Sequence, residues 1–243
     1  MPLMPADRPT ELTGTSGTLF VVATPLGNLE DITLRAARVL GEVHTVLAED
    51  TRRTRRLLTH LGHGTATLSL HQHNEKGRIE QVVRMLERGD NLALVSDAGT
   101  PAISDPGFPL IRAVTQRGLT VVPVPGPCAL AAAASAAGLP TDRLHFIGFL
   151  PTRPGRRRKV LEEALQLRAT TVLYASPHKL LKDLALLVEI AGPERPACLC
   201  RELTKVHEEF DRASLGELLE KWSDRKIRGE ITLLVAPREK GSG

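Results

Sequence analysis

Two adjacent carboxylates, Glu49 and Asp50, follow the short apolar run TVLA and stand directly before a group of arginines. A ribose hydroxyl has a high pKa, so an enzyme that acts on it gains from a carboxylate within hydrogen-bond reach. The pair therefore suits a general base beside a phosphate-binding cluster. Asp50 or Thr51 could instead cap the helix that follows, and that is a complete structural explanation. The sequence leaves both interpretations open.

Residues 96–107, SDAGTPAISDPG, follow another apolar run and carry more Gly, Pro, Asp and hydroxyl residues than a surface turn requires. We therefore expect this loop to be functional. Asp97 is placed to accept hydrogen bonds from ribose hydroxyls or an ammonium group. Asp105 is expected to cap the helix after Pro106.

A shorter loop, TPLGNLED at residues 24–31, also follows an apolar run. Gly27 allows a tight turn or the close approach of a ligand, and Asp31 and Thr33 suit a helix start. This loop matches neither G-x-G-x-x-G nor the phosphate-cradling G-x-x-x-x-G-K-[ST]. The sequence therefore disfavours a dinucleotide or nucleoside-triphosphate site.

Basic residues are bunched into two clusters, although the net charge is only +4. Such clusters indicate an anionic partner, and the alternative is a solvated face or a mobile loop. Aromatic residues make up only 3% of the chain, which argues against a platform of stacked RNA bases. We therefore expect contacts mainly with backbone phosphates. The expected RNA-binding residues are Arg52, Arg53, Arg55, Arg56, Arg153, Arg156, Arg157, Arg158 and Lys159.

The histidines, the cysteines and the charged segment at 201–209 do not by themselves indicate a further site. His71 and His73 could share one strand face, but no third ligand is in view, so they are read as polar loop residues and no metal is expected. The three cysteines show no C-x-x-C spacing and are expected to be buried small residues. Residues 201–209 mix both charges densely, which fits either a solvated hairpin or a substrate-facing loop.

Short β-branched apolar runs alternate with amphipathic segments of helix length along the chain. The runs LFVVA, TVLA and LALVS are continuously apolar, as in parallel strands covered by helices on both faces. We therefore predict an α/β fold with two α/β domains. The predicted divisions are a disordered leader at 1–17, an N-terminal domain at 18–124, a C-terminal domain at 125–237 and a tail at 238–243.

The predicted elements can be stated by residue range. Strands are expected at 19–23, 45–48, 92–96, 120–124, 144–148, 171–175, 197–200 and 230–235, and helices at 32–40, 54–61, 79–86, 108–116, 129–137, 159–167, 179–190 and 215–222.

Composition bounds the class of protein. The chain has 243 residues, 42% hydrophobic and 25% charged, which is typical of a folded globular protein. No apolar run approaches the length of a membrane-spanning helix, and the first 17 residues lack the apolar core of a signal peptide. The cytoplasm is therefore the expected location.

Five strings, in this order, resemble the tetrapyrrole methylase superfamily of S-adenosylmethionine-dependent methyltransferases. They are LFVVATPLGNLEDITLRA, VLAEDTRRTRRLL, LVSDAGTPAISDPGFPL, VVPVPGPCAL and RELTKVHEEF. Within the superfamily, the chain is most similar to the branch that acts on ribosomal RNA of the small subunit. The resemblance implies two α/β domains with the cofactor cleft between them, a homodimer, and 2′-O-methylation of a cytidine in the decoding centre of 16S ribosomal RNA.

The resemblance also implies a set of cofactor-binding residues. These are Pro25 and Gly27 in the first loop, Asp97, Gly99 and Pro101 in the second, Pro125, Gly126 and Pro127 between the domains, and Ala175, Ser176 and Leu203 at the adenine pocket.

The expected reaction is direct transfer from the sulfonium to a ribose 2′-oxygen, with Glu49 or Asp50 as base and no metal. Two alternatives stay open. One is a superfamily enzyme acting on a small tetrapyrrole or a protein side chain, although such enzymes more often carry a richer glycine pattern in the first loop. The other is a non-catalytic RNA-binding factor.

Overall fold

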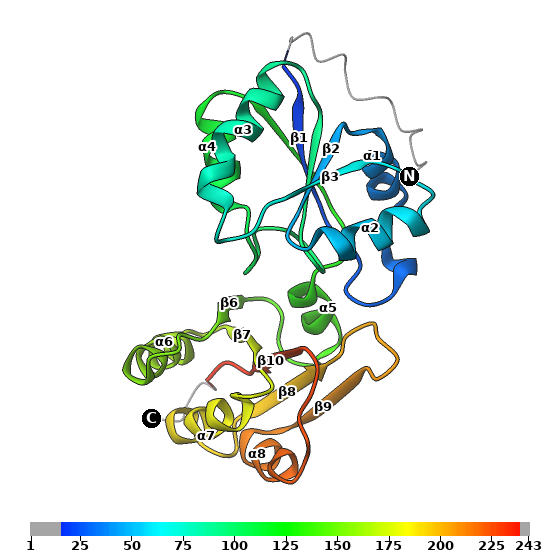
Figure 1. The fold of residues 1–243 in the computed structure, drawn as a ribbon. Coiled ribbons are helices and arrows are strands. Elements are labelled where there is room, and N and C mark those ends of the chain that lie inside the picture. Colours follow the sequence, from blue (N-terminus) through cyan, green and yellow to red (C-terminus); the bar gives the residue numbers. More distant parts are fainter. Residues whose placement is uncertain (1–15, 239–243) are drawn as a thin grey trace. The chain divides into compact units, whose positions relative to one another are not determined.

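The computed structural model describes residues 16–238 and divides them into two compact units (Figure 1). Unit 1 comprises the described residues up to Ala23 together with Thr33–Pro125, and unit 2 comprises Thr24–Ile32 and the described residues from Gly126 onward. The sequence did not indicate that the segment Thr24–Ile32 belongs with the second unit.

The expected leader and tail fall mostly outside the described part of the chain. Residues 1–15 and 239–243 are not described. Gly17 is described, and its N–H donates to the Leu86 carbonyl at 2.7 Å, so this residue is already part of unit 1.

Unit 1 is built on a five-stranded sheet in the order β3-β2-β4-β1-β5. Every pairing is parallel, which confirms the prediction from the continuously apolar runs. Pro123 is accommodated in β5 because β5 is an edge strand. The strands are β1 Thr18–Val22, β2 Thr45–Ala48, β3 Ala66–Ser69, β4 Leu92–Val95 and β5 Thr120–Val124.

Helices cover both faces of this sheet. Two of them pack their apolar residues against Leu19, Leu47 and Leu94 on one face, and the other two lie on the opposite face (Figure 1). The first pair is α3 Glu75–Glu87 and α4 Phe108–Gln116, and the second is α1 Leu34–Glu42 and α2 Thr51–His60. Thr33 caps α1 by accepting the Ala36 N–H, as predicted for a residue at the helix start.

Unit 2 contains a mixed five-stranded sheet in the order β6-β7-β10-β8-β9. Only β6 and β7 run parallel, and the other pairs are antiparallel. The strands are β6 Leu144–Phe149, β7 Thr170–Ala175, β8 Pro196–Arg201, β9 Glu209–Ser214 and β10 Ile231–Val235.

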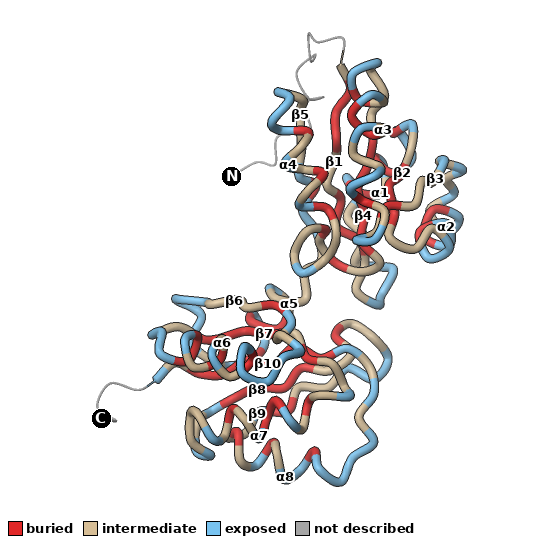
Figure 2. Tube along the Cα trace, turned by 60° about the vertical axis from the view of Figure 1, so that its left-hand side comes forward, coloured by how far each residue is buried: buried red, intermediate tan, exposed pale blue. Residues whose placement is uncertain are grey.

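The two faces of the second sheet are covered differently. On one face pack α6 Pro154–Gln166, α7 Leu180–Ala191 and α8 Leu215–Ser223. The other face packs against α5 Ala129–Ala136 and against Leu26, which comes from the 24–32 segment with its short 3-10 helix, Leu29–Asp31. Figure 2 shows that buried residues concentrate along the central strands of each unit.

Two smaller features complete the fold. Cys198 and Cys200 are buried as predicted, whereas Cys128 is only partly buried, and all three cysteines are free. In the described part of the chain, no helix combines the length and the apolar character that a membrane crossing requires.

Candidate active site

Asp50 forms the N-cap of α2. Its carboxylate accepts the N–H of Arg52 at 2.8 Å, and the Arg52 guanidinium lies 3.3 Å from the other oxygen. These hydrogen bonds from Arg52 lower the pKa of Asp50. The helix-capping role that the sequence suggested therefore accounts for Asp50. The lowered pKa of its carboxyl makes it a weak proton acceptor.

Glu49, one residue earlier, lies in different surroundings. Burial raises the pKa of Glu49, and the nearby negative charge of Asp97 raises it further. Asp97 is held in place because it accepts the Asp50 N–H at 2.9 Å and lies 3.4 Å from the Arg53 guanidinium. The carboxyl ends of β2 and β4 thus bring two predicted site residues, Glu49 and Asp97, together.

The loop after β4 has an unusual backbone. Gly99 is buried and has a φ of +81°, a conformation that favours glycine. Ala102 and Ser104 both adopt a φ of +65°, which is rare and strained for residues with a side chain. The Ser96 hydroxyl donates to the Gly99 carbonyl and helps to hold the loop. Such strain is typical of functional loops.

The end of this loop forms one wall of a pocket of about 300 Å³ that lies wholly in unit 1. Asp105 lines the pocket. The N-cap position of α4 is held by Gly107, so the predicted cap lies two residues too early, and the buried Glu75 accepts the Leu110 N–H at 3.2 Å. The lining residues are Glu49, Gln72, Glu75, Ser104, Asp105, Pro106, Gly107, Phe108 and Pro109.

In unit 2, the loop at residues 24–31 contacts the connection between β8 and β9. A Cβ on Gly27 would stand 2.2 Å from the Lys205 Cγ, so a larger residue there would displace the Lys205 side chain. Lys205 is fixed by Glu202 at 2.8 Å and by Glu230 at 3.1 Å. Residues 201–209 thus span the hairpin connection between β8 and β9.

The same connection resembles the loop of unit 1 in carrying backbone strain. Glu202 and Thr204 have φ values of +51° and +66°. The Thr204 Oγ1 atom is buried and has no hydrogen-bond partner within residues 16–238, while Leu203 beside it is buried. A buried hydroxyl without a partner is uncommon and points to a group that pairs with a ligand.

The expected cofactor residues occur in both units. Unit 1 holds Asp97, Gly99, Pro101 and Pro125, and unit 2 holds Pro25, Gly27, Gly126, Pro127, Ala175, Ser176 and Leu203. In unit 2, Ala175 ends β7 and Ser176 follows it. Leu26, the neighbour of Gly27, packs in the same apolar cluster as Leu203.

The first basic cluster lies on α2. Arg52, Arg53, Arg55 and Arg56 are all exposed, while the opposite side of the helix buries Leu57 and Leu58. The amphipathic helix therefore presents four arginines on one solvent-facing surface.

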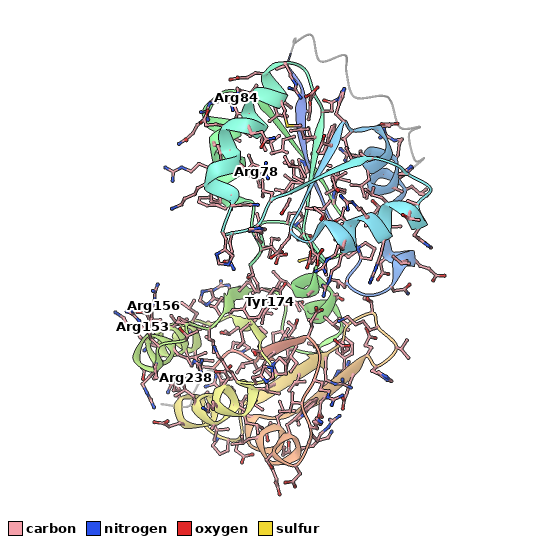
Figure 3. The ribbon with its side chains drawn as sticks, in the orientation of Figure 1. Arg78, Arg84, Arg153, Arg156, Tyr174 and Arg238 are labelled. Atoms are coloured by element: carbon pink, nitrogen blue, oxygen red, sulfur yellow. The ribbon has the colours of Figure 1, made fainter. Side chains whose placement is uncertain are left out.

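The second basic cluster is smaller than predicted. Arg153 and Arg156 are exposed at the start of α6 (Figure 3). Arg157 is buried, lies 3.0 Å from Asp183 and donates to the Pro151 carbonyl. Its assignment to RNA binding is therefore corrected, since its guanidinium is enclosed by unit 2. Arg158 pairs with Glu162 and Glu189, and Lys159 with Glu163.

The histidine pair forms no metal centre with its neighbours. The rings of His71 and His73 stand edge to face, 5.9 Å apart. Within residues 16–238, no group of three or more His, Cys, Asp or Glu side chains is arranged to hold a metal ion.

The profile of the family described as Tetrapyrrole (Corrin/Porphyrin) Methylases matches residues 18–219. The chain belongs to the tetrapyrrole methylase family. Curated relatives include "Ribosomal RNA small subunit methyltransferase I" of Pseudomonas aeruginosa, which is 49% identical over 91% of this chain and 79% of its own length. The protein of the same name from Escherichia coli O157:H7 is 46% identical over 90% of this chain and 77% of its own.

Solved structures of other methyltransferases share the fold. The methyltransferase CobJ superposes with a TM-score of 0.71 at 21% identity, over 93% of this chain and 98% of its own. Uroporphyrin-III C-methyltransferase from Thermus thermophilus, solved with S-adenosyl homocysteine, has a TM-score of 0.65 at 18% identity. The match covers 90% of this chain and 97% of that protein. These likenesses confirm two α/β domains of this type.

Proposed function

We propose that this tetrapyrrole methylase transfers a methyl group from S-adenosylmethionine to the ribose 2′-oxygen of a cytidine in 16S ribosomal RNA. The proposed substrate is the decoding centre of the small ribosomal subunit, and the proposed working form is a cytoplasmic homodimer. The names of relatives at 46–49% identity support an RNA substrate. The observation that carries the proposal is Glu49, a carboxyl of raised pKa, three residues before the first of the four exposed arginines of α2.

The residues present fit an S-adenosylmethionine molecule. Asp97 offers a carboxylate for hydroxyl or ammonium groups, Gly27 brings its backbone against the Lys205 side chain, and Thr204 has a buried hydroxyl that lacks a hydrogen-bond partner within residues 16–238. We propose that these residues hold it with Pro25, Gly99, Pro101, Pro125, Gly126, Pro127, Ala175, Ser176 and Leu203. When bound, S-adenosylmethionine supplies an electrophilic methyl group on a sulfonium.

The chain's own residues have separate roles in this proposal. Glu49 accepts the proton of the 2′-hydroxyl, because its raised pKa makes it a stronger base than an ordinary carboxylate. Asp50 caps α2 and fixes the backbone that presents Glu49. Arg52, Arg53, Arg55 and Arg56 hold backbone phosphates and orient the ribose.

The test is methyl transfer from radiolabelled S-adenosylmethionine to small subunits that lack the modification, followed by mapping of the labelled nucleotide. Label on the 2′-oxygen of one decoding-centre cytidine is the expected result. Cofactor binding without transfer to subunits would contradict the RNA substrate and favour a small tetrapyrrole or a protein side chain. Absence of cofactor binding would leave a non-catalytic RNA-binding factor.

A further inference from the structure

Three aromatic rings meet at one edge of the sheet of unit 2. The rings of Phe146 and Phe149 both stand edge to face against Tyr174, with centroid distances of 4.9 Å and 5.5 Å. The two phenylalanines belong to the edge strand β6, and the tyrosine belongs to its neighbour β7. Aromatic residues are few in this chain, five Phe, one Tyr and one Trp. The low percentage argued against stacked bases, but a percentage does not show where the rings lie.

A β-bulge puts both phenylalanines on the same face of the sheet. Successive side chains of a strand point to opposite faces, so residues three apart ordinarily do not share a face. In β6 the register with β7 shifts between Phe146 and Gly148, and Gly148 has a φ of +61°. Phe149 is thereby set opposite Tyr174. Phe146 lies opposite Val172, which shares a face of β7 with Tyr174. Bulges often re-aim side chains in this way at functional edges.

The aromatic cluster runs from the core of unit 2 to its surface. Phe146 packs with the buried residues around α5, whereas Phe149 is 59% exposed. A single exposed apolar side chain is ordinary in a folded protein. The Phe149 ring differs because Tyr174 supports it on one side while much of its surface stays in water. A supported ring of this kind offers a surface on which another planar group can stack.

Two arginines without ion pairs follow this ring along the chain. Arg153 and Arg156 are exposed at the start of α6 (Figure 3), and neither guanidinium forms an ion pair within residues 16–238. The first turn of α6 contains no acidic residue that could offset their charge. Because Arg153 comes four residues after Phe149, the two Cα atoms lie within about 14 Å of each other. Positive charge without a partner in the described chain therefore stands near the open ring.

This combination fits single-stranded RNA better than another protein surface. Bases of any sequence stack on aromatic rings, and arginines hold the phosphates on either side. A second copy of this chain would bring its own arginines to the same surface, whereas RNA brings negative charge. Charge complementarity therefore favours RNA.

We propose that the Phe149 ring stacks on an unpaired base of the substrate RNA, while Arg153 and Arg156 contact the neighbouring phosphates. The inference rests on the proposed function, since the RNA is the substrate proposed above. It adds a binding surface in unit 2 to the α2 arginines of unit 1.

The first test measures filter binding of unmodified small subunits to wild type, Phe149→Ala, Phe149→Leu and Phe149→Tyr. Loss of one stacked base should weaken affinity by about tenfold to a hundredfold in the Ala and Leu variants. Phe149→Tyr keeps the ring and should restore most of the affinity. Leucine is apolar but not planar, so it separates stacking from simple burial of apolar surface. Leu167→Ala is the control, because Leu167 is 46% exposed at the other end of α6.

The second test separates the ring from the charges. Arg153→Gln/Arg156→Gln should make the slope of log affinity against log salt concentration shallower by about 1.4–1.8, the value for two lost phosphate contacts. Phe149→Ala should leave this slope unchanged, because an uncharged ring releases no counterions. Lys226→Gln/Arg228→Gln is the matched control, since it removes two exposed charges from the connection between α8 and β10. Its slope should stay nearly that of wild type.

Two further measurements distinguish other occupants of the surface. Calorimetric affinity for S-adenosylmethionine and self-association in sedimentation equilibrium should be the same in wild type and Phe149→Ala. Equal affinity for subunits in these two proteins would overturn this inference alone. Loss of cofactor binding or of self-association in that case would assign the ring to the cofactor or to a second copy. A wild type that binds subunits through Phe149 but transfers no methyl group to them would overturn the proposed function and support the RNA surface.

Discussion

Glu49 and Asp50 are neighbours in sequence, but the structure gives them opposite electrostatic surroundings. Burial and Asp97 raise the pKa of Glu49, whereas hydrogen bonds from Arg52 lower the pKa of Asp50. The sequence could suggest Asp50 as a helix cap, but nothing in it marks Glu49 as the carboxyl of raised pKa, because that shift comes from burial and from Asp97, which lies 48 residues away along the chain.

Replacement of Glu49 by Gln should lower the single-turnover rate of methyl transfer by about a hundredfold or more, the usual contribution of a general base. Asp50→Asn should change the rate far less, since asparagine also caps helices. Rapid-quench measurement at saturating S-adenosylmethionine checks both. Equal rates for wild type and Glu49→Gln would remove Glu49 from the mechanism.

The pH dependence provides an independent test of the same residue. Glu49 acts as a base only when deprotonated, so the rate should fall as pH decreases through its raised pKa. Asp97→Asn removes the negative charge that contributes to this shift, so the acidic limb should move to lower pH. A pH profile of the rate at saturating cofactor measures the change. An acidic limb at the same pH in Asp97→Asn and wild type would contradict the electrostatic coupling between Asp97 and Glu49.

Arg157 shows how a residue in a basic cluster can serve the core. Burial raises the pKa of Asp183, and Arg157 opposes this shift. Arg157→Met should lower the free energy of unfolding by about 3–5 kcal/mol, because it leaves a buried charge without its partner. The loss should shrink at low pH as Asp183 becomes protonated. Urea unfolding measures it, with Arg158→Met, at an exposed pair, as the control expected to change little.

Gly107, at the N-cap position of α4, combines a backbone turn with a place on the wall of the pocket. Gly107→Ala should destabilise the protein by about 1–3 kcal/mol, since the added Cβ meets Leu94 and φ is positive. Gly155→Ala is the matched control, because it lies in α6 with no atom within 4 Å of its Cβ, and it should stabilise by about 0.5–1 kcal/mol. Chemical denaturation of both variants checks the opposite signs.

Elements with a strong apolar pattern were predicted with their observed bounds, as β2, α4 and β5 show. Helix starts were less accurate. The helix α2 begins at Thr51 and α6 at Pro154, each earlier than predicted, because a capping Asp50 and a proline in the first turn extend them. The earlier start of α6 gives Arg157, Leu161 and Leu165 one helical face, a spacing that could have identified Arg157 as buried.

Two strands were missed for a physical reason. The strand β3 is only partly buried, and β9, EFDRAS, carries three charged residues, so neither shows an apolar run. The strand β3 forms because it pairs with β2, and β9 forms because it pairs with β8. The residues within β3 and β9 give no sign of this pairing.

At the scale of the whole molecule, sequence motifs identified loops but not their assembly. The loop at 96–107 was recognised from its composition, yet the pocket was not, because its walls come from three segments separated by more than 20 residues. Phe108 and Glu75 carry no local signal, since one resembles a core aromatic and the other an ordinary acid at a helix start.

The arrangement of positive charge, rather than its total, should control affinity for the ribosomal subunit. The net charge is small, so long-range attraction must come from local surfaces such as the α2 arginines. Arg55→Gln/Arg56→Gln removes two charges from α2. The slope of log affinity against log salt concentration should then become shallower by about 1.4–1.8, the value for two lost phosphate contacts.

A matched variant separates local contact from total charge. Arg84→Gln/Arg112→Gln also removes two exposed charges from unit 1, but from α3 and α4, and should leave the slope nearly unchanged. Filter binding to small subunits over a series of salt concentrations measures both. Equal changes in the two variants would show that net charge alone drives association, whereas a change confined to the α2 variant would assign the phosphate contacts to the helix that begins beside Glu49.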